Sequence, residues 1–164
     1  MNYLDKKIAV SPTSSKTLRE IVGDSGLWMV WKLPILSYNS IKKLAKEANL
    51  QPCCEPKLVC TPTDDNKMQH IWIIWLQDAS GNKLYSEWEA SKYNTGKWVG
   101  NPAKYVELTQ IDAQYRSRMA YKRAYCRCVL DILWLDEFYS DSDASAFQKS
   151  NSQQEDNTIN ITDL

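Results

Sequence analysis

The stretch that decides the fold is AQYRSRMAYKRAYCRCVL, residues 113–130. It holds five basic residues and no acidic one. The spacing of its apolar residues predicts a long helix that begins near Tyr105 or Thr109 and ends near Leu135. One side of this helix is apolar and should pack on a sheet: Tyr121, Tyr125, Cys128, Ile132 and Leu135.

The basic residues of this helix fall into two groups. At about 100° per residue, Arg116, Arg123 and Arg127 lie within about 40° of each other, and Arg118 and Lys122 form a second pair. Small residues lie beside the first group: Ala113, Ala120 and Ala124. Guanidinium groups over small side chains favour a phosphate backbone and stack on bases, so we expect this face to bind nucleic acid. A solvated or inter-subunit face is the other interpretation.

Three predicted strands precede the helix, over residues 56–61, 67–78 and 83–93. The middle strand carries Ile and Trp on both faces, as a central strand does. Turn-rich segments at 62–66 and 78–82 join the three, which predicts an antiparallel meander. Farther upstream we expect a short helix over 16–22, an extended segment over 27–31 and a helix over 37–49. The predicted fold is therefore α+β, an antiparallel three-strand meander packed by a long helix (a β-β-β-α core).

The segment between the meander and the long helix is expected to be a loop over 94–102. Basic and aromatic residues alternate in and around it: Lys92, Tyr93, Lys97, Trp98, Lys104 and Tyr105. Cations for phosphate and rings for stacking are what a single-strand channel needs. Trp98 could equally be buried in the core or in a subunit interface.

Charge is unevenly distributed along the chain. Residues 1–135 hold 19 basic and 13 acidic residues, whereas residues 136–164 hold one basic and seven acidic residues. This asymmetry indicates a basic body with a polyanion partner. We predict one domain over 1–139 and a disordered acidic tail over 140–164, because the tail has too few apolar residues to fold. The tail should compete with DNA, and its tip at 159–164 could recruit a host replication or repair protein.

Several other classes of protein are disfavoured. The first residues lack the apolar region of a signal peptide, and the longest apolar run, 71–76, is too short to span a bilayer. The five cysteines are an odd number without export signals, so we expect reduced thiols and a cytoplasmic location, in the host if the chain is phage-encoded. Their spacing does not match a zinc site, and no phosphate-binding loop is present. We therefore expect no metal, no cofactor and no catalytic residue.

A metal-dependent nuclease is the one enzyme class that the sequence weakly suggests. Asp78, Glu87, Glu89 and Lys92 fall on neighbouring predicted strands, where carboxylates could hold magnesium and a lysine could activate water. Lys92 comes three residues after Glu89, which places it on the opposite face of the strand. This spacing argues against the assignment.

Three sequence segments together resemble those of phage and bacterial single-strand annealing proteins of the DdrA, Erf and RecT superfamily. The segments are LAKEANL at 44–50, EWEAS at 87–91 and MAYKRAYCR at 119–127. The resemblance covers roughly residues 5–140. It implies subunits that assemble into rings or filaments and DNA held along the helix by Arg116, Lys122, Arg123 and Arg127. The chain departs from the pattern at 132–135, where a helix-ending glycine is common in the family.

The function predicted from the sequence is that of an oligomeric protein which binds single-stranded DNA and anneals complementary strands in recombination and repair. No bond is made or broken in such a reaction. The alternative is a protein-binding module, for instance a phage counter-defence factor, on the same scaffold. Ring size, strand polarity and DNA against RNA preference are left open by the sequence.

Overall fold

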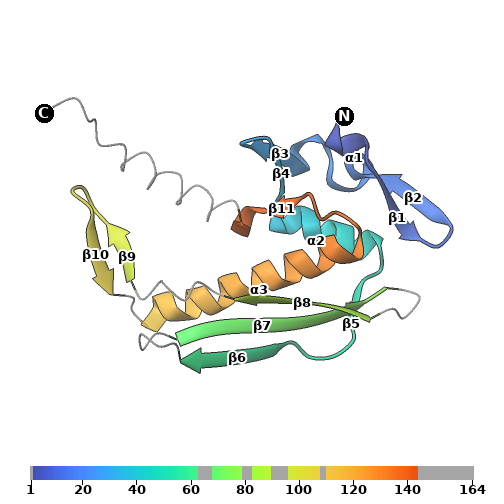
Figure 1. Cartoon of the computed structure of the whole chain (residues 1–164). Helices are drawn as coiled ribbons and strands as arrows, with labels where there is room; N and C mark the ends of the chain where they lie inside the picture. Colours follow the sequence, from blue (N-terminus) through green and yellow to red (C-terminus); the bar gives the residue numbers. More distant parts are fainter. Residues whose placement is uncertain (1, 63–67, 79–82, 90–95, 108–109, 144–164) are drawn as a thin grey trace, which may run out of the picture.

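The structure is a computed structural model that describes residues 2–62, 68–78, 83–89, 96–107 and 110–143. It confirms the α+β class. The long helix α3 (Gln110–Ile132) lies between two layers (Figure 1). A sheet covers one side of it, and helix α2 (Tyr38–Glu47) with a smaller sheet covers the other. None of the helices in the described ranges is long and apolar enough to cross a membrane.

The larger sheet is built around strand β7 (Met68–Gln77). Strand β6 (Lys57–Pro62) pairs antiparallel with one edge of β7, and β8 (Lys83–Glu89) pairs antiparallel with the other. The short strand β5 (Gln51–Pro52) extends the edge that β6 occupies, because its partners in β7 are Leu76 and Gln77. Ile74 and Leu76 of β7 are buried, as expected of a central strand.

The smaller sheet joins two distant parts of the chain. Strands β3 (Leu27–Val30) and β4 (Leu33–Leu36) form a hairpin, and β11 (Tyr139–Ser140) adds to β4 in parallel. The hairpin turn consists of Trp31 and Lys32, both with positive φ (53° and 68°). Both central residues of a two-residue I′ turn need positive φ, which usually selects Asn and Gly. The absence of such residues explains why the sequence did not predict β4.

The N-terminal part forms a hairpin of its own. Strand β1 (Lys7–Ser11) pairs with β2 (Ser14–Thr17), and the short helices η1 (Tyr3–Asp5), α1 (Leu18–Val22) and η2 (Asp24–Gly26) flank this pair. The Thr17 side chain caps α1, and the carboxylate of Glu20 accepts a bond from the Thr17 amide in return. The expected helix over 16–22 is thus confirmed in type but begins two residues later.

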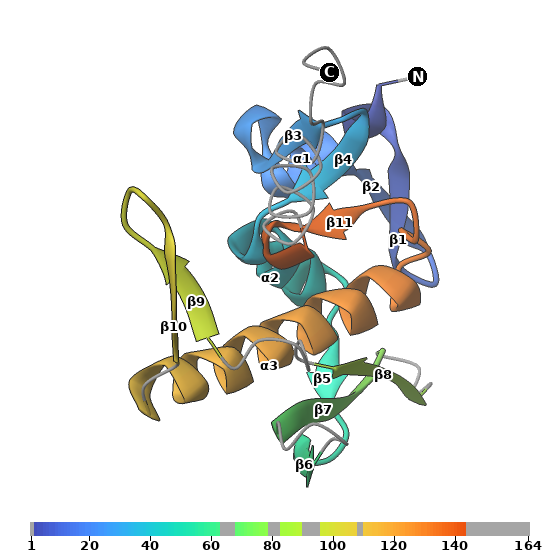
Figure 2. The same cartoon turned by 60° about the vertical axis from the view of Figure 1, so that its left-hand side comes forward.

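One expectation about the segment before α3 needs correction, and the segment after α3 is packed. The segment expected to be a loop over 94–102 contains β9 (Gly96–Val99), which pairs with β10 (Lys104–Glu107) in a hairpin that stands away from the other elements (Figure 2). At the other end, the first residues of the predicted tail pack against the body. Ser140, Ser142 and Asp143 are buried against the body, so the packed chain extends at least to Asp143.

Helix α3 ends in a motif that normally contains glycine. The Leu135 amide donates to the Leu130 carbonyl (2.8 Å) and the Trp134 amide to the Asp131 carbonyl (3.2 Å). These are the two bonds of a Schellman cap, and the accompanying apolar pair, Leu130 and Leu135, is fully buried. Trp134 occupies the left-handed position (φ 57°), and its side chain is 81% exposed. The chain therefore ends its helix without the expected glycine.

We predict that Trp134→Gly stabilises the fold. A side chain in the left-handed region costs roughly 1–2 kcal/mol, whereas the extra flexibility of an unfolded glycine costs roughly 0.5–1 kcal/mol. The expected gain is about 0.5–1 kcal/mol in the free energy of unfolding, measured by urea denaturation. Trp134→Ala is the matched control, since it removes the indole but keeps the Cβ. Equal stabilities of the two variants would contradict the prediction.

Candidate nucleic-acid interface

The side of α3 that the sequence predicts to be open is covered by protein. Ala120 and Ala124, the small residues beside the predicted arginine stripe, are both 0% exposed. Cys126 and Cys128 are also buried, and the Cys128 thiol lies 3.9 Å from the Ile74 carbonyl oxygen of β7. Other parts of the chain therefore pack against these small side chains, and a phosphate backbone cannot reach them.

Arg123 and Arg127 bind the segment that follows α3. Arg123 donates from Nε and Nη2 to the Ser142 carbonyl oxygen (3.2 and 3.1 Å). Arg127 Nη2 lies 3.4 Å from the Phe138 carbonyl oxygen and 3.7 Å from Asp143 Oδ2, and its guanidinium lies over the Tyr139 ring. Both arginines are half-buried. They hold residues 138–143 against the helix, so these two predicted DNA contacts have a structural role.

The acidic residues of this segment are part of the same arrangement. Asp143 Oδ2 accepts bonds from the Ser140 amide (3.2 Å) and hydroxyl (3.0 Å). Asp141 Oδ2 accepts from the Tyr38 amide at the first turn of α2 (3.3 Å), where the helix dipole favours a negative charge. The two acids that the sequence assigns to a tail therefore join α2, α3 and β11.

A cluster of tyrosines and lysines lies between α2 and α3. The Lys42 and Lys122 ammonium groups lie over the same Tyr38 ring, 4.8 and 5.1 Å from its centroid. Tyr38 meets Tyr125 edge to face at 5.9 Å, and Tyr125 stacks with Tyr121 at 6.5 Å. We call this set the tyrosine–lysine face: Tyr38, Lys42, Tyr121, Lys122 and Tyr125.

The sheet supports the tyrosine–lysine face from below. Trp72 of β7 meets the Tyr121 ring edge to face at 5.3 Å, and its indole nitrogen donates to the Ser117 hydroxyl (3.1 Å). Burial raises the pKa of Tyr38 and raises that of Tyr125 to about 12. Both hydroxyls are therefore neutral at physiological pH, and the charge of the face comes from its two lysines. Cations beside ring faces suit a single-stranded nucleic acid.

The other residues predicted to contact DNA are either exposed or have side chains that lie outside the described part of the chain. Arg118 is exposed on α3, and Lys104 is exposed on β10. Arg116 lies in α3 and Lys97 and Trp98 lie in β9, but their side chains lie outside the described part. Lys92 lies outside the described residues altogether. Of the predicted residues whose side chains the structure describes, Lys122 is the one that lies over an aromatic ring of the tyrosine–lysine face.

Sequence reasoning missed Tyr38 and Lys42. The sequence indicated only that Lys42 faces away from the apolar side of its helix, as solvated lysines commonly do. Their role depends on α2 crossing α3, which brings together residues about 80 positions apart. The one available signal was the Ser37 cap, which fixes where α2 begins and hence which way Tyr38 points.

The described residues give no support to a metal centre. No three His, Cys, Asp or Glu side chains among them are placed to hold an ion. Glu87 and Glu89 pair across β7 and β8 with Ile73 and Ile71, and their side chains lie outside the described part. The Cys126 thiol is not a candidate nucleophile either, because burial and the nearby Asp141 and Asp143 raise its pKa to about 12.

We predict that Arg123→Ala destabilises the fold by about 1.5–3 kcal/mol, the usual range for a hydrogen bond to a charged group. Arg118→Ala is the control, because Arg118 is exposed on the same helix and its removal should change stability by less than about 0.5 kcal/mol. Thermal and urea unfolding measure both. A normal stability of the Arg123 variant would mean that the arginine does not hold residues 138–143.

We also predict that stability falls at alkaline pH. The pKa of Cys126 is raised from 9.0 to about 12 and that of Tyr125 from 10.0 to about 12. Above pH 9 the unfolded chain loses the thiol proton while the folded chain keeps it. The free energy of unfolding should therefore fall with rising pH, by up to about 1.4 kcal/mol per pH unit for each group. Cys126→Ala should make the decline between about pH 9 and 10 shallower, and an unchanged slope would refute the assignment.

The chain was also compared with known proteins. No family model, no curated protein and no solved structure matched the chain. Function is therefore inferred from the residues of the chain and from their geometry.

Proposed function

We propose that the protein binds single-stranded DNA on the tyrosine–lysine face and promotes the annealing of complementary strands. The observation that carries the proposal is the placement of Lys42 and Lys122 over one tyrosine ring. The two ammonium groups lie around one ring, so their positive potentials add there and attract a phosphate backbone. The partly exposed rings of Tyr121 and Tyr125 adjoin them, and aromatic rings can stack on bases whatever their sequence.

The proposal includes the architecture that the sequence suggested. Strands β6, β7 and β8 pair in succession, and α3 lies along them. In this proposal that unit is the structural core, and α2 adds the second wall of the DNA site. Arg118 and the exposed lysines Lys46 and Lys104 extend the positive surface beyond the face itself.

An annealing protein must hold a strand without competing with the complementary strand. Contacts to phosphates and to ring faces leave the Watson–Crick edges of the bases free to pair. The tyrosine–lysine face has no side-chain amide of the kind that reads base edges in pairs. We therefore expect little sequence preference and a release that depends on formation of the duplex.

The test is a double variant, Lys42→Ala with Lys122→Ala, in a fluorescence titration with a labelled oligonucleotide of mixed sequence. We expect binding to weaken about tenfold or more. The salt dependence of log affinity should also become shallower by about 0.7 for each phosphate that the variant no longer neutralises. Annealing of complementary oligonucleotides should slow in parallel.

The matched control is Lys43→Ala with Lys57→Ala. It removes the same charge from exposed positions on α2 and β6 that lie outside the tyrosine–lysine face. A general electrostatic effect would weaken both double variants equally, and that result would remove the face as the binding site. Unfolding curves of both variants exclude a loss of structure as the cause.

A second candidate function is supported by the β3–β4 hairpin. Its edge strand and turn expose large apolar side chains: Trp28 (40%), Met29 (48%) and Trp31 (71%). Exposed clusters of this kind mark protein-binding surfaces, which favours the alternative of a protein-binding or counter-defence module. The two candidates are separable, because Trp31→Ser should weaken binding to a protein partner and leave DNA binding unchanged.

A further inference from the structure

The hairpin of β9 and β10, here called the arm, has no visible support within the described part of the chain. Among the described residues its extensive contacts are between its own two strands, and both views show it standing away from the body (Figures 1 and 2). Residues 100–104 and Val106 are exposed. An isolated two-stranded hairpin is only marginally stable in water. The arm therefore needs a surface that the described body does not provide.

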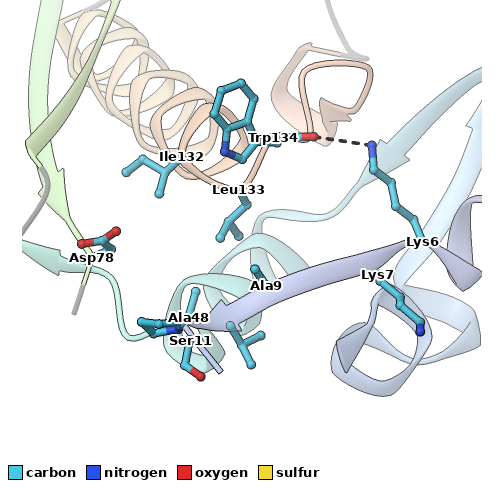
Figure 3. A pocket seen from close by; sticks show the side chains of 11 residues that line it. Lys6, Lys7, Ala9, Ser11, Ala48, Asp78, Ile132, Leu133 and Trp134 are labelled. Carbon is cyan, nitrogen blue, oxygen red and sulfur yellow. Dashed lines mark hydrogen bonds between the residues drawn. The ribbon is translucent and has the colours of Figure 1, made fainter. Parts of the chain in front are cut away.

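A groove lies near the opposite end of α3. Its volume is about 480 Å³, and its walls come from β1, the end of α2, the end of β7 and the last turn of α3. Ala9, Ala48, Ile132 and Leu133 supply apolar lining, and the Trp134 indole stands at the rim (Figure 3). The groove is wide enough for a few small residues, and the tip of the arm consists of Gly100, Asn101, Pro102 and Ala103.

Trp134 has a conformation and an exposure that the single chain does not explain. The position is left-handed, so glycine would be less strained there, and the indole is 81% exposed. Strain of this kind is retained where it serves a function, and tryptophan is among the side chains that contribute most at interfaces. A large exposed ring beside a groove fits a surface that another protein covers.

The arm is basic, whereas the segments that form the groove carry acidic residues as well as lysines. The arm carries Lys97 and Lys104 against the single acid Glu107. Asp78 lines the groove, and the exposed residues Asp131 and Asp136 flank its lining segment 132–134 in the sequence. Two basic residues, Lys6 and Lys7, line the groove, and the charge of Lys6 is paired with that of Glu137. The carbonyl end of α3 adds negative potential here.

We propose that the arm of one copy of the chain docks in the Trp134 groove of the next copy. Because the two features lie near opposite ends of α3, the contact is head to tail and propagates along the helix direction into a ring or a filament. This assembly does not depend on DNA binding. It would nevertheless serve DNA binding, since successive copies would place their tyrosine–lysine faces in a row.

The experiment uses full-length protein without DNA, in sedimentation velocity over a range of concentrations. The arm variant is Lys104→Glu with Val106→Asp. The groove variant is Ala9→Arg, which fills the groove from an exposed position and repels the arm. Ser14→Arg is the matched control, because it adds the same charge to an exposed position on the same N-terminal hairpin.

We expect wild type and Ser14→Arg to assemble, and each of the other two variants alone to associate at least about tenfold more weakly. An equimolar mixture of the arm and groove variants should form dimers that do not grow, since one intact arm meets one intact groove. Monomeric wild type at all concentrations would overturn the proposal, as would normal assembly of either variant or a mixture that stays monomeric.

Trp134→Gly gives a second test, because it should weaken assembly while it stabilises the single chain. Unchanged assembly of the Lys42, Lys122 double variant separates this interface from the DNA site.

Discussion

The structure depends on two hydrogen bonds from the Arg123 guanidinium to the Ser142 carbonyl oxygen. They tie the end of the described chain back onto α3, where Arg127, Tyr139 and Asp143 extend the contact. Once this segment is in place, β11 can pair with β4 and Asp141 can reach the first turn of α2. Helix α3 is then buried on two sides, which places Cys126 and Cys128 in the interior although they point in different directions.

This arrangement divides the cations of α3 by role. Arg123 and Arg127 direct their hydrogen bonds to the protein itself, whereas Lys122 faces a tyrosine ring that it shares with Lys42 of another helix. A basic helix can therefore be partly structural and partly available to a ligand. The groups that each cation contacts, rather than the number of charges on the helix, decide which cations are structural and which can bind a ligand.

The sequence was informative where periodicity is long and strong. The range of α3, the helix over 37–49 and the strand positions for β6, β7 and β8 agree with the structure to within a few residues. It failed where geometry overrides local preference: Trp31 and Lys32 form a turn without Asn or Gly, and Trp134 ends a helix without Gly. It also could not place β11, a two-residue strand in an acid-rich segment. For the candidate site, Lys122 was foreseeable from the helix alone, whereas Tyr38 and Lys42 required knowledge of how α2 crosses α3.

The parallel pairing of β11 with β4 has a consequence for how the chain is made. Strand β4 emerges from the ribosome early, but the strand that completes its sheet is about a hundred residues farther along, or roughly 5–20 s of synthesis at usual rates. During that interval one edge of β4 and the side of α2 near Tyr38 have no cover. The nascent chain therefore presents an apolar strand edge until Tyr139 and Ser140 leave the exit tunnel, which makes this the stage at which a holdase chaperone has most to protect.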